Sequence, residues 1–168
     1  MMGIALVVSL AMLTTSCHKD ETNNTGNNNG NTENPGGGSG NQGQVLPNAV
    51  TDVDGNSYDA VQIGDQVWMA ENLRTTRYAN GESISLGTST STTTPYRYNP
   101  NDDNVSTYGY LYNWSAVMHG ASSSEANPSG VQGICPNGWH VPSSAEWIQL
   151  TNYVGSQPQY QCNNNSIN

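Results

Sequence analysis

The sequence has no phenylalanine and very few basic residues. Four lysine and arginine side chains stand against 13 aspartates and glutamates, which gives the 168-residue chain a formal net charge of −9. A nucleic-acid binder neutralises phosphates with clustered lysine and arginine, and electrostatic docking on anionic lipid needs a similar cluster. The sequence therefore argues against a nucleic-acid partner. Its basic residues are scattered along the chain: Lys19, Arg74, Arg77 and Arg97.

The sequence also lacks an apolar run long enough to cross a bilayer. Its N-terminal apolar stretch, residues 4–13, has ten residues, about half of the roughly 20 that a transmembrane helix needs. A short apolar core in this place is typical of a secretory signal peptide. Together with the cysteine shortly after this core, it predicts a lipoprotein signal peptide over residues 1–16.

Small and polar residues at positions 14–16 lead to Cys17. This order resembles the lipobox of bacterial lipoproteins, although no leucine stands three places before the cysteine and no basic residue precedes the apolar core. The resemblance implies that Cys17 is lipidated and is the first residue of the mature protein. The alternative, a buried cysteine after an ordinary apolar helix, is disfavoured because no packable residues come directly after Cys17.

Apolar residues are absent from the next stretch. Residues 18–44 contain no aliphatic, aromatic or sulfur-containing side chain, and asparagine and glycine dominate. Such a segment has nothing to bury against the entropy of ordering, so residues 17–44 are predicted to be a disordered tether of about 30 Å. The charged residues 18–21 resemble the export signal of Bacteroidetes surface lipoproteins; a solvated charge cluster is the other interpretation. The expected location is the outer membrane, facing the surface.

The packable part of the chain begins at Val45, and residues 45–168 are predicted to form one domain. Residues 49–73 alternate apolar and polar side chains around two turn signals, at residues 54–56 and 64–65, which predicts a β-meander. A helix is predicted over residues 144–154, because Ser143 and Glu146 form a capping box. Gly155 is then expected to end the helix.

Aromatic residues recur at every second position from Tyr108 to Trp114. This spacing predicts a strand with four rings on one face. Tyrosine and tryptophan combine a flat apolar surface with a polar edge, so these rings are candidates for stacking on a ligand. The alternative is that a domain without phenylalanine builds its core from tyrosine and from tryptophans 68, 114, 139 and 147. The candidate stacking residues are Tyr108, Tyr110, Tyr112 and Trp114.

Four sequence blocks resemble the Fibrobacter succinogenes major paralogous domain, a family common in surface lipoproteins of Bacteroidetes and Fibrobacteres. Its Gly-Trp-His-Val-Pro block, at residues 138–142, is also similar to a block of formylglycine-generating enzymes. These resemblances imply an α+β domain of the C-type-lectin-like fold with no assigned biochemical activity. The blocks are residues 52–56, 63–73, 108–114 and 135–147.

Members of this family continue well past the position of Cys162, to a final strand that contains a cysteine. The resemblance therefore implies that this chain is C-terminally truncated and leaves an open edge near Val50. Two arrangements of the remaining cysteines stay open. Cys135 and Cys162 form a disulfide with each other, or each has its own partner in the absent segment, as the family implies.

No metal, cofactor or catalytic motif stands out. His119, His140 and Cys135 lack the paired spacing of structural zinc sites. Residues 52–56 carry oxygen ligands that suit calcium, but their glycine is misplaced for an EF-hand loop, so a hairpin turn is favoured. We expect no metal and no cofactor, and we expect that the protein is not an enzyme.

The leading hypothesis is a non-catalytic surface lipoprotein. It would be held on the membrane by its lipid anchor and present a lectin-like domain for adhesion, with a glycan or a surface protein as the partner. One alternative is an enzyme of the formylglycine-generating fold whose active site lies in the absent segment. Another is a truncated fragment without function.

Overall fold

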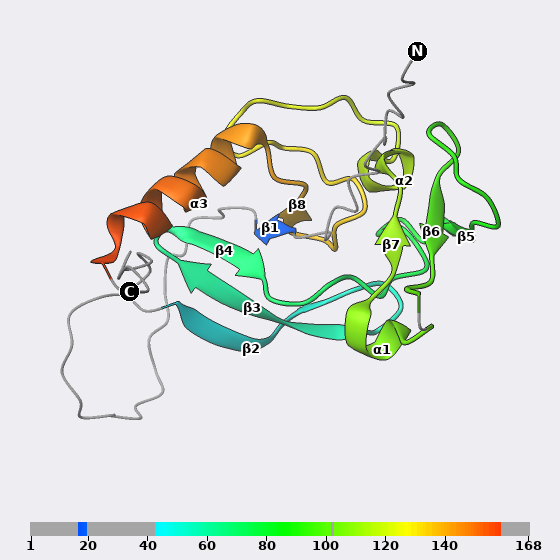
Figure 1. Cartoon of the computed structure of the whole chain (residues 1–168), viewed down its shortest axis with the longest axis horizontal. Coiled ribbons are helices and arrows are strands. Elements are labelled where there is room, and N and C mark those ends of the chain that lie inside the picture. The colour runs from blue at the N-terminus through cyan, green and yellow to red at the C-terminus, as the bar shows by residue number, and fades with distance from the viewer. Residues whose placement is uncertain (1–16, 20–42, 102, 159–168) are drawn as a thin grey trace, which may run out of the picture.

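The computed structural model describes residues 17–19, 43–101 and 103–158. Within these residues the chain combines short strands with a few helices, so the predicted α+β class is confirmed. The strands form a five-stranded and a three-stranded sheet (Figure 1). No helix in these residues is both long and apolar enough to cross a membrane.

The larger sheet contains five antiparallel strands: β1 (His18–Lys19), β2 (Gln44–Thr51), β3 (Ser57–Ile63), β4 (Gln66–Met69) and β8 (Trp139–His140). Their order is β2-β3-β4-β1-β8. The strands β2, β3 and β4 form the predicted meander, and β1 and β8 continue the sheet beyond β4. Of the strands described, β2 and β8 are therefore the sheet edges.

The turns of the meander form where the sequence predicts them. At the first turn, Oδ1 of Asp52 accepts hydrogen bonds from the amides of Asp54 and Asn56, each at 2.9 Å. This side chain satisfies backbone donors that the strands leave unpaired, as is usual for aspartate in turns. At the second turn Gly64 has φ 61°, which a residue with a side chain adopts at a cost.

Strand β1 corrects the predicted tether at its N-terminal end. His18 pairs with Trp68 of β4 on one side and with His140 of β8 on the other. Both Cys17 and His18 are buried. Residues 17–19 are thus part of the folded domain, because a partner strand on each side satisfies their backbone. The predicted signal peptide and residues 20–42 of the tether lie outside the described residues.

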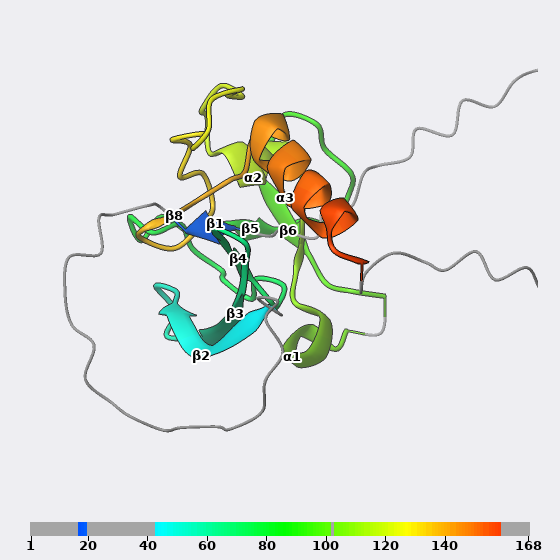
Figure 2. The ribbon, with the colours of Figure 1, turned by 90° about the vertical axis from the view of Figure 1, so that its left-hand side faces the viewer.

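The smaller sheet contains β5 (Ser85–Leu86), β6 (Tyr96–Tyr98) and β7 (Leu111–Tyr112). Strand β5 is parallel to β6, and β7 is antiparallel to β6. Two short helices flank β7 along the chain, α1 (Val105–Tyr108) and α2 (Trp114–Met118). Both views place these helices at opposite ends of β7 (Figure 1; Figure 2).

The continuous strand predicted over residues 108–114 is therefore wrong, and local backbone chemistry explains why. Asn104 and Asn113 each accept a hydrogen bond from the amide three residues later, at 3.1 Å and 3.0 Å, and so begin a helix. Between the helices Gly109 has φ 69°, and a Cβ there would lie 2.6 Å from the carbonyl oxygen of Leu73. These two caps favour helical turns, so the strand that the alternating aromatic residues predicted does not form over the whole segment.

Helix α3 (Ser144–Ser156) carries the predicted capping box. The Ser143 hydroxyl accepts from the amide of Glu146 at 3.3 Å, and Glu146 Oε2 accepts from the amide of Ser143 at 2.9 Å. The prediction that Gly155 ends the helix is wrong, because Gly155 lies inside the helix. The helix continues to Ser156, and Gln157 is the C-cap residue. The helix lies over one end of the larger sheet (Figure 2).

The hydrophobic core takes residues from both sheets and from α2, and it is built from aromatic, aliphatic and sulfur-containing residues. Trp139 belongs to it and Trp68 is also buried, so the packing role predicted for these two tryptophans is confirmed. Trp114 is half exposed, so that role is wrong for Trp114. Trp147 is partly exposed, but its ring packs on that of Trp68 with centroids 4.6 Å apart. The residues with the most fully buried large side chains include Tyr58, Leu73, Ile84, Ile134 and Val117.

Candidate functional site

Two of the four candidate stacking aromatics are structural. Tyr112 is buried, and its hydroxyl donates to the carbonyl oxygen of Thr75 at 2.8 Å. Burial raises the pKa of Tyr112. Tyr110 packs against the core, and the guanidinium of Arg97 lies 5.0 Å from its ring centroid. The prediction is therefore wrong for Tyr112, and Tyr110 is a partly buried ring engaged by the core and by Arg97.

The other two candidates are exposed but lie apart. Tyr108 has 51% of its surface accessible and Trp114 has 53%. Tyr108 ends α1 and Trp114 begins α2, and these helices lie at opposite ends of β7 (Figure 1). The predicted face of four rings does not form, because the chain turns at Gly109 between them.

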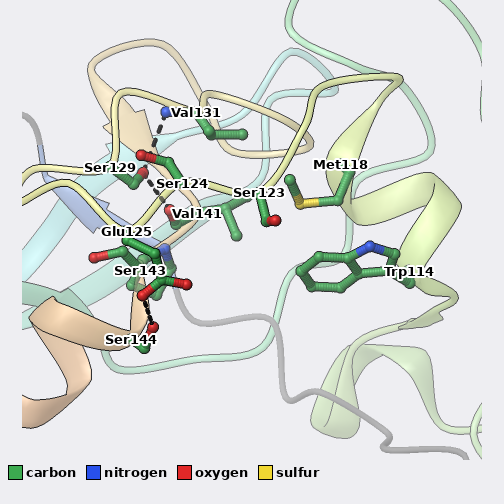
Figure 3. A pocket seen from close by; sticks show the side chains of 11 residues that line it. Trp114, Met118, Ser123, Ser124, Glu125, Ser129, Val131, Val141, Ser143 and Ser144 are labelled. Carbon is green, nitrogen blue, oxygen red and sulfur yellow. Dashed lines mark hydrogen bonds between the residues drawn. The ribbon is translucent and has the colours of Figure 1, made fainter.

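Trp114 lines a surface cavity of about 150 Å³. Trp114 and Met118 of α2 form one wall, and serines and Glu125 from the following loops face them (Figure 3). The remaining wall is the connection from β8 into α3. The cavity is lined by Trp114, Met118, Ser123, Ser124, Glu125, Ser129, Val131, Val141, Pro142, Ser143 and Ser144.

Hydrogen bonds fix part of the polar wall of this cavity. The Ser129 hydroxyl donates to the carbonyl oxygen of Val141 at 2.5 Å and accepts from the amide of Val131 at 3.2 Å. The hydroxyl of Ser144 donates to a carboxylate oxygen of Glu125. An exposed indole therefore faces a set of hydroxyl and carboxylate groups, a combination that binds a ligand with both apolar and hydrogen-bonding faces.

A disulfide bond joins Cys17 to Cys135, with an S–S distance of 2.05 Å and a Cα–Cα distance of 5.8 Å. Neither arrangement left open for Cys135 holds in this structure, because strand β1 brings Cys17 to Cys135 and a sulfur forms one such bond. Both the pairing with Cys162 and a partner in an absent segment are therefore wrong for Cys135. Cys162 lies outside the described residues. The sulfur of Cys17 cannot at once form this disulfide and carry a lipid, so the bond and the predicted acylation exclude each other in one molecule.

Beside this disulfide, three buried side chains form a cluster that we call the His-Glu cluster: His18, His140 and Glu146. Nδ1 of His18 lies 2.7 Å from Oε1 of Glu146, and Nε2 of His140 lies 2.6 Å from the same oxygen. The two ring nitrogens are 3.1 Å apart. Each of these residues is at most 3% exposed.

The cluster lies directly behind the cavity. The second carboxylate oxygen of Glu146, Oε2, accepts from the amides of Ser129 and Ser143, at 3.1 Å and 2.9 Å, and both serines line the cavity. Burial acts to raise the pKa of Glu146, but the hydrogen bonds from Ser143, His140 and His18 outweigh it and hold the pKa below its usual value. Glu146 is therefore an ionised group in the interior.

Sequence patterns pointed only in part to this cluster. The capping box identified Glu146, and His140 was considered as a zinc ligand that lacks a paired partner in sequence. Nothing in the sequence marked His18 as a buried residue, since it begins a charged segment that leads into an asparagine-rich and glycine-rich stretch. His119, the remaining histidine, lies elsewhere: its ring stacks on Tyr78 with centroids 3.6 Å apart.

The candidate calcium ligands at residues 52–56 form the predicted hairpin turn. Asp54 binds the neighbouring segment, since its carboxylate accepts from the amide of Thr76 at 2.5 Å and from Nε of Arg77 at 2.7 Å. Burial acts to raise the pKa of Asp54, and these hydrogen bonds lower it by more. The turn interpretation is confirmed.

Comparison with known proteins identifies the family. The model of the Fibrobacter succinogenes major domain matches residues 61–167. This range covers well over half of the chain and includes β4, β8 and α3. No curated protein and no solved structure matches. The family resemblance is thereby confirmed over the three blocks at residues 63–73, 108–114 and 135–147, while the block at residues 52–56 lies before the matched range; the chain belongs to the Fibrobacter succinogenes major domain family.

Proposed function

We propose that this domain is a non-catalytic recognition module that binds a neutral carbohydrate at the cavity beside Trp114. The observation that carries the proposal is the half-exposed indole of Trp114 opposite serine hydroxyls and Glu125 (Figure 3). A sugar ring has an apolar face that stacks on an aromatic ring, and it has hydroxyl groups at its rim. Its chemistry therefore matches both walls of the cavity.

The charge of the chain favours a neutral sugar over an acidic one. The formal net charge is −9, and Glu125 adds a carboxylate at the cavity itself. A negative surface lowers the local concentration of anionic ligands and slows their association. Sialylated or sulfated glycans are therefore expected to bind more weakly than neutral ones of the same size.

A glycan array probed with the full chain, followed by calorimetric titration of the best ligand, tests this proposal. Loss of a stacking ring costs about 0.5–1.5 kcal/mol beyond the lost area, so Trp114→Ala should weaken binding by about tenfold or more. Tyr108→Ala is the matched control, because Tyr108 is equally exposed but lies at the other end of β7. Equal affinity of the Trp114→Ala variant and the wild type would contradict the proposal.

We also propose that the fold is C-type-lectin-like. Support comes from the two sheets, from helix α3, the longest helix of the described residues, directly after the Gly-Trp-His-Val-Pro block, and from the family resemblance of that block. An experimental structure of a longer family member tests this, with the position of its final strand as the criterion. A final strand that pairs outside the sheet containing β2 would contradict it.

Display on the bacterial surface is the cellular part of the proposal. The apolar residues 4–13 support export. The Cys17–Cys135 disulfide fits an exported, unacylated form in an oxidising compartment, whereas in the anchored form the sulfur of Cys17 carries lipid and is not bonded to Cys135. Mass spectrometry of the peptide that contains Cys17, isolated from envelope fractions, distinguishes the two forms: an acylated peptide supports the anchor, and a peptide linked to Cys135 contradicts it.

A further inference from the structure

Three metal-ligating atoms from distant parts of the chain meet at one buried point. Nδ1 of His18 comes from β1, Nε2 of His140 from β8 and Oε1 of Glu146 from α3. The three atoms lie between 2.6 Å and 3.1 Å from one another. The three side chains are buried behind the cavity wall and line no part of the cavity, so the assignment of this cluster does not rest on carbohydrate binding.

Hydrogen bonds between two imidazoles and a carboxylate leave one side of this triangle unmatched. In such a set any proton inside the triangle sits on a ring nitrogen. If both nitrogens donate to Oε1 of Glu146, two N–H groups face each other across the 3.1 Å between His18 and His140. If one nitrogen instead accepts a hydrogen bond from the other, the accepting nitrogen has no proton to donate to Oε1. A lone pair on that nitrogen then faces a lone pair on the carboxylate oxygen. A cation between the three atoms removes this conflict, because it accepts a lone pair from each.

The size of the triangle fits a small divalent ion. The circle through the three atoms has a radius of about 1.6 Å by the distances between them, and zinc binds histidine nitrogen and carboxylate oxygen at about 2.0–2.1 Å. An ion at that distance from all three atoms would lie a little over 1 Å out of their plane. A tetrahedral ion with bonds of that length separates its ligand atoms by about 3.3 Å, so the three atoms would move apart by about 0.2–0.7 Å when the ion binds, and the fourth ligand would come from outside the set.

The donor types indicate which metal. Two imidazoles and one carboxylate suit zinc and its neighbours in the first transition row. Calcium and magnesium prefer a cage of oxygen ligands, which this cluster lacks among the described residues. We propose that His18, His140 and Glu146 form a zinc site in which Glu146 binds through Oε1 alone.

The surroundings hold the ligands in place. Oε2 of Glu146 is engaged by the amides of Ser129 and Ser143, which leaves Oε1 to face the histidines. The ring of His18 lies 5.0 Å from that of Trp68 and meets that of His140 edge to face, at 4.9 Å. Fixed outer contacts of this kind orient the ligands of metal sites and raise their affinity.

The test is titration of the full-length, oxidised protein with zinc after it has been stripped with chelator. We expect one zinc ion per chain, and cobalt in its place should give the intense visible absorption of a tetrahedral site with nitrogen and oxygen ligands. His140→Ala should weaken zinc binding by more than about 100-fold, beyond what loss of an outer contact does. His119→Ala is the matched control, since it removes the histidine that pairs with Glu82 and stacks on Tyr78.

Two results would overturn the assignment. One is a wild-type protein that takes up no stoichiometric zinc at micromolar concentration, which decides the matter even if His140→Ala fails to fold. The other is equal loss of zinc in the His119→Ala and His140→Ala variants. A Cys162→Ser variant guards against binding by the remaining thiol: it should bind zinc as the wild type does, and loss of binding would count against the cluster.

Discussion

Replacing Cys17 with serine should destabilise the folded domain strongly. In the structure Cys17 does two things: it bonds to Cys135, and it precedes the two residues of β1 that fill the gap between β4 and β8. Without the bond, β1 is held only by its own short ladders and the His-Glu cluster. The substitution therefore tests whether these first described residues belong to the domain.

The magnitude depends on the length of chain that the bond closes. Cys17 and Cys135 are 118 residues apart. In the chain-entropy account, closing a loop of that length stabilises a fold by about 4.8 kcal/mol at 25 °C. Measured losses for native disulfides in small domains are about 2–5 kcal/mol, so a loss of about 3 kcal/mol is a moderate expectation.

Urea unfolding followed by circular dichroism measures this loss. With a slope of about 1.5 kcal/mol per molar urea, a loss of about 3 kcal/mol lowers the midpoint by about 2 M. Cys17→Ser and Cys135→Ser should have equal midpoints, and the double variant should match them, because each substitution removes the same bond. Cys162→Ser is the control and should unfold like the wild type.

Two outcomes would refute this reasoning. If Cys162→Ser lowers the midpoint as much as Cys135→Ser while Cys17→Ser leaves it unchanged, then Cys135 pairs with Cys162. If the denatured, unreduced wild type exposes three reactive thiols, no disulfide is present. The structure requires one reactive thiol, because two of the three cysteines are bonded.

Three further substitutions test other parts of the structure. Asp54→Asn should cost about 1–3 kcal/mol at pH 7, because its hydrogen bonds to a guanidinium and to a backbone amide weaken. Since folding lowers the pKa of Asp54 below 3.8, the stabilisation is complete above that pH and is lost as the pH falls through the folded-state pKa, so urea midpoints of variant and wild type should converge in acid. Gly109→Ala should cost about 1–3 kcal/mol and lower the melting temperature, because φ is 69° and the new Cβ would lie 2.6 Å from a carbonyl oxygen; an unchanged melting temperature would contradict this. Ser143→Ala should cost about 1 kcal/mol by removing the N-cap of α3, as measured by urea unfolding, whereas Ser144→Ala, one residue later, should not lose that capping contribution.

The parts of the fold that sequence predicted are those whose causes are local. The capping box of Ser143 and Glu146 joins residues three apart, and Asp52 closes its turn within four residues. Such hydrogen bonds form from neighbouring residues alone, so a sequence pattern contains all their partners. The meander was predictable from the same turns, with alternation of side chains between them.

The alternating aromatic residues at positions 108–114 led to a wrong strand prediction. Alternation of side chains determines the local backbone less strongly than a residue that caps a helix. Asn104 and Asn113 both precede helical turns, and asparagine is among the preferred N-cap residues. Within these seven positions the chain ends α1 at Tyr108, turns at Gly109 with a positive φ, forms the two-residue strand β7 and begins α2 at Trp114. The pattern was correct in one respect, since Tyr112 does lie in a strand, with its ring in the core.

The candidate site was the least predictable part, because its members meet only in three dimensions. His18 and Glu146 are separated by 128 positions, and His18 lies in a stretch with no apolar neighbours to indicate burial. Its place in the sheet depends on Trp68, His140 and the disulfide at Cys17, none of which a local pattern includes. Trp114 was identified from sequence, but the cavity beside it is formed by loops whose course no periodicity predicts.

The position of β1 between β4 and β8 has a consequence for synthesis. His18 leaves the ribosome well before Trp68, and His140 is made about 120 residues after His18. At about 5–20 residues per second, the first strand waits roughly 6–24 s for its second neighbour. Until then one edge of β1 has no partner strand on the nascent chain. β1 is therefore among the last strands of this sheet to be paired on both sides.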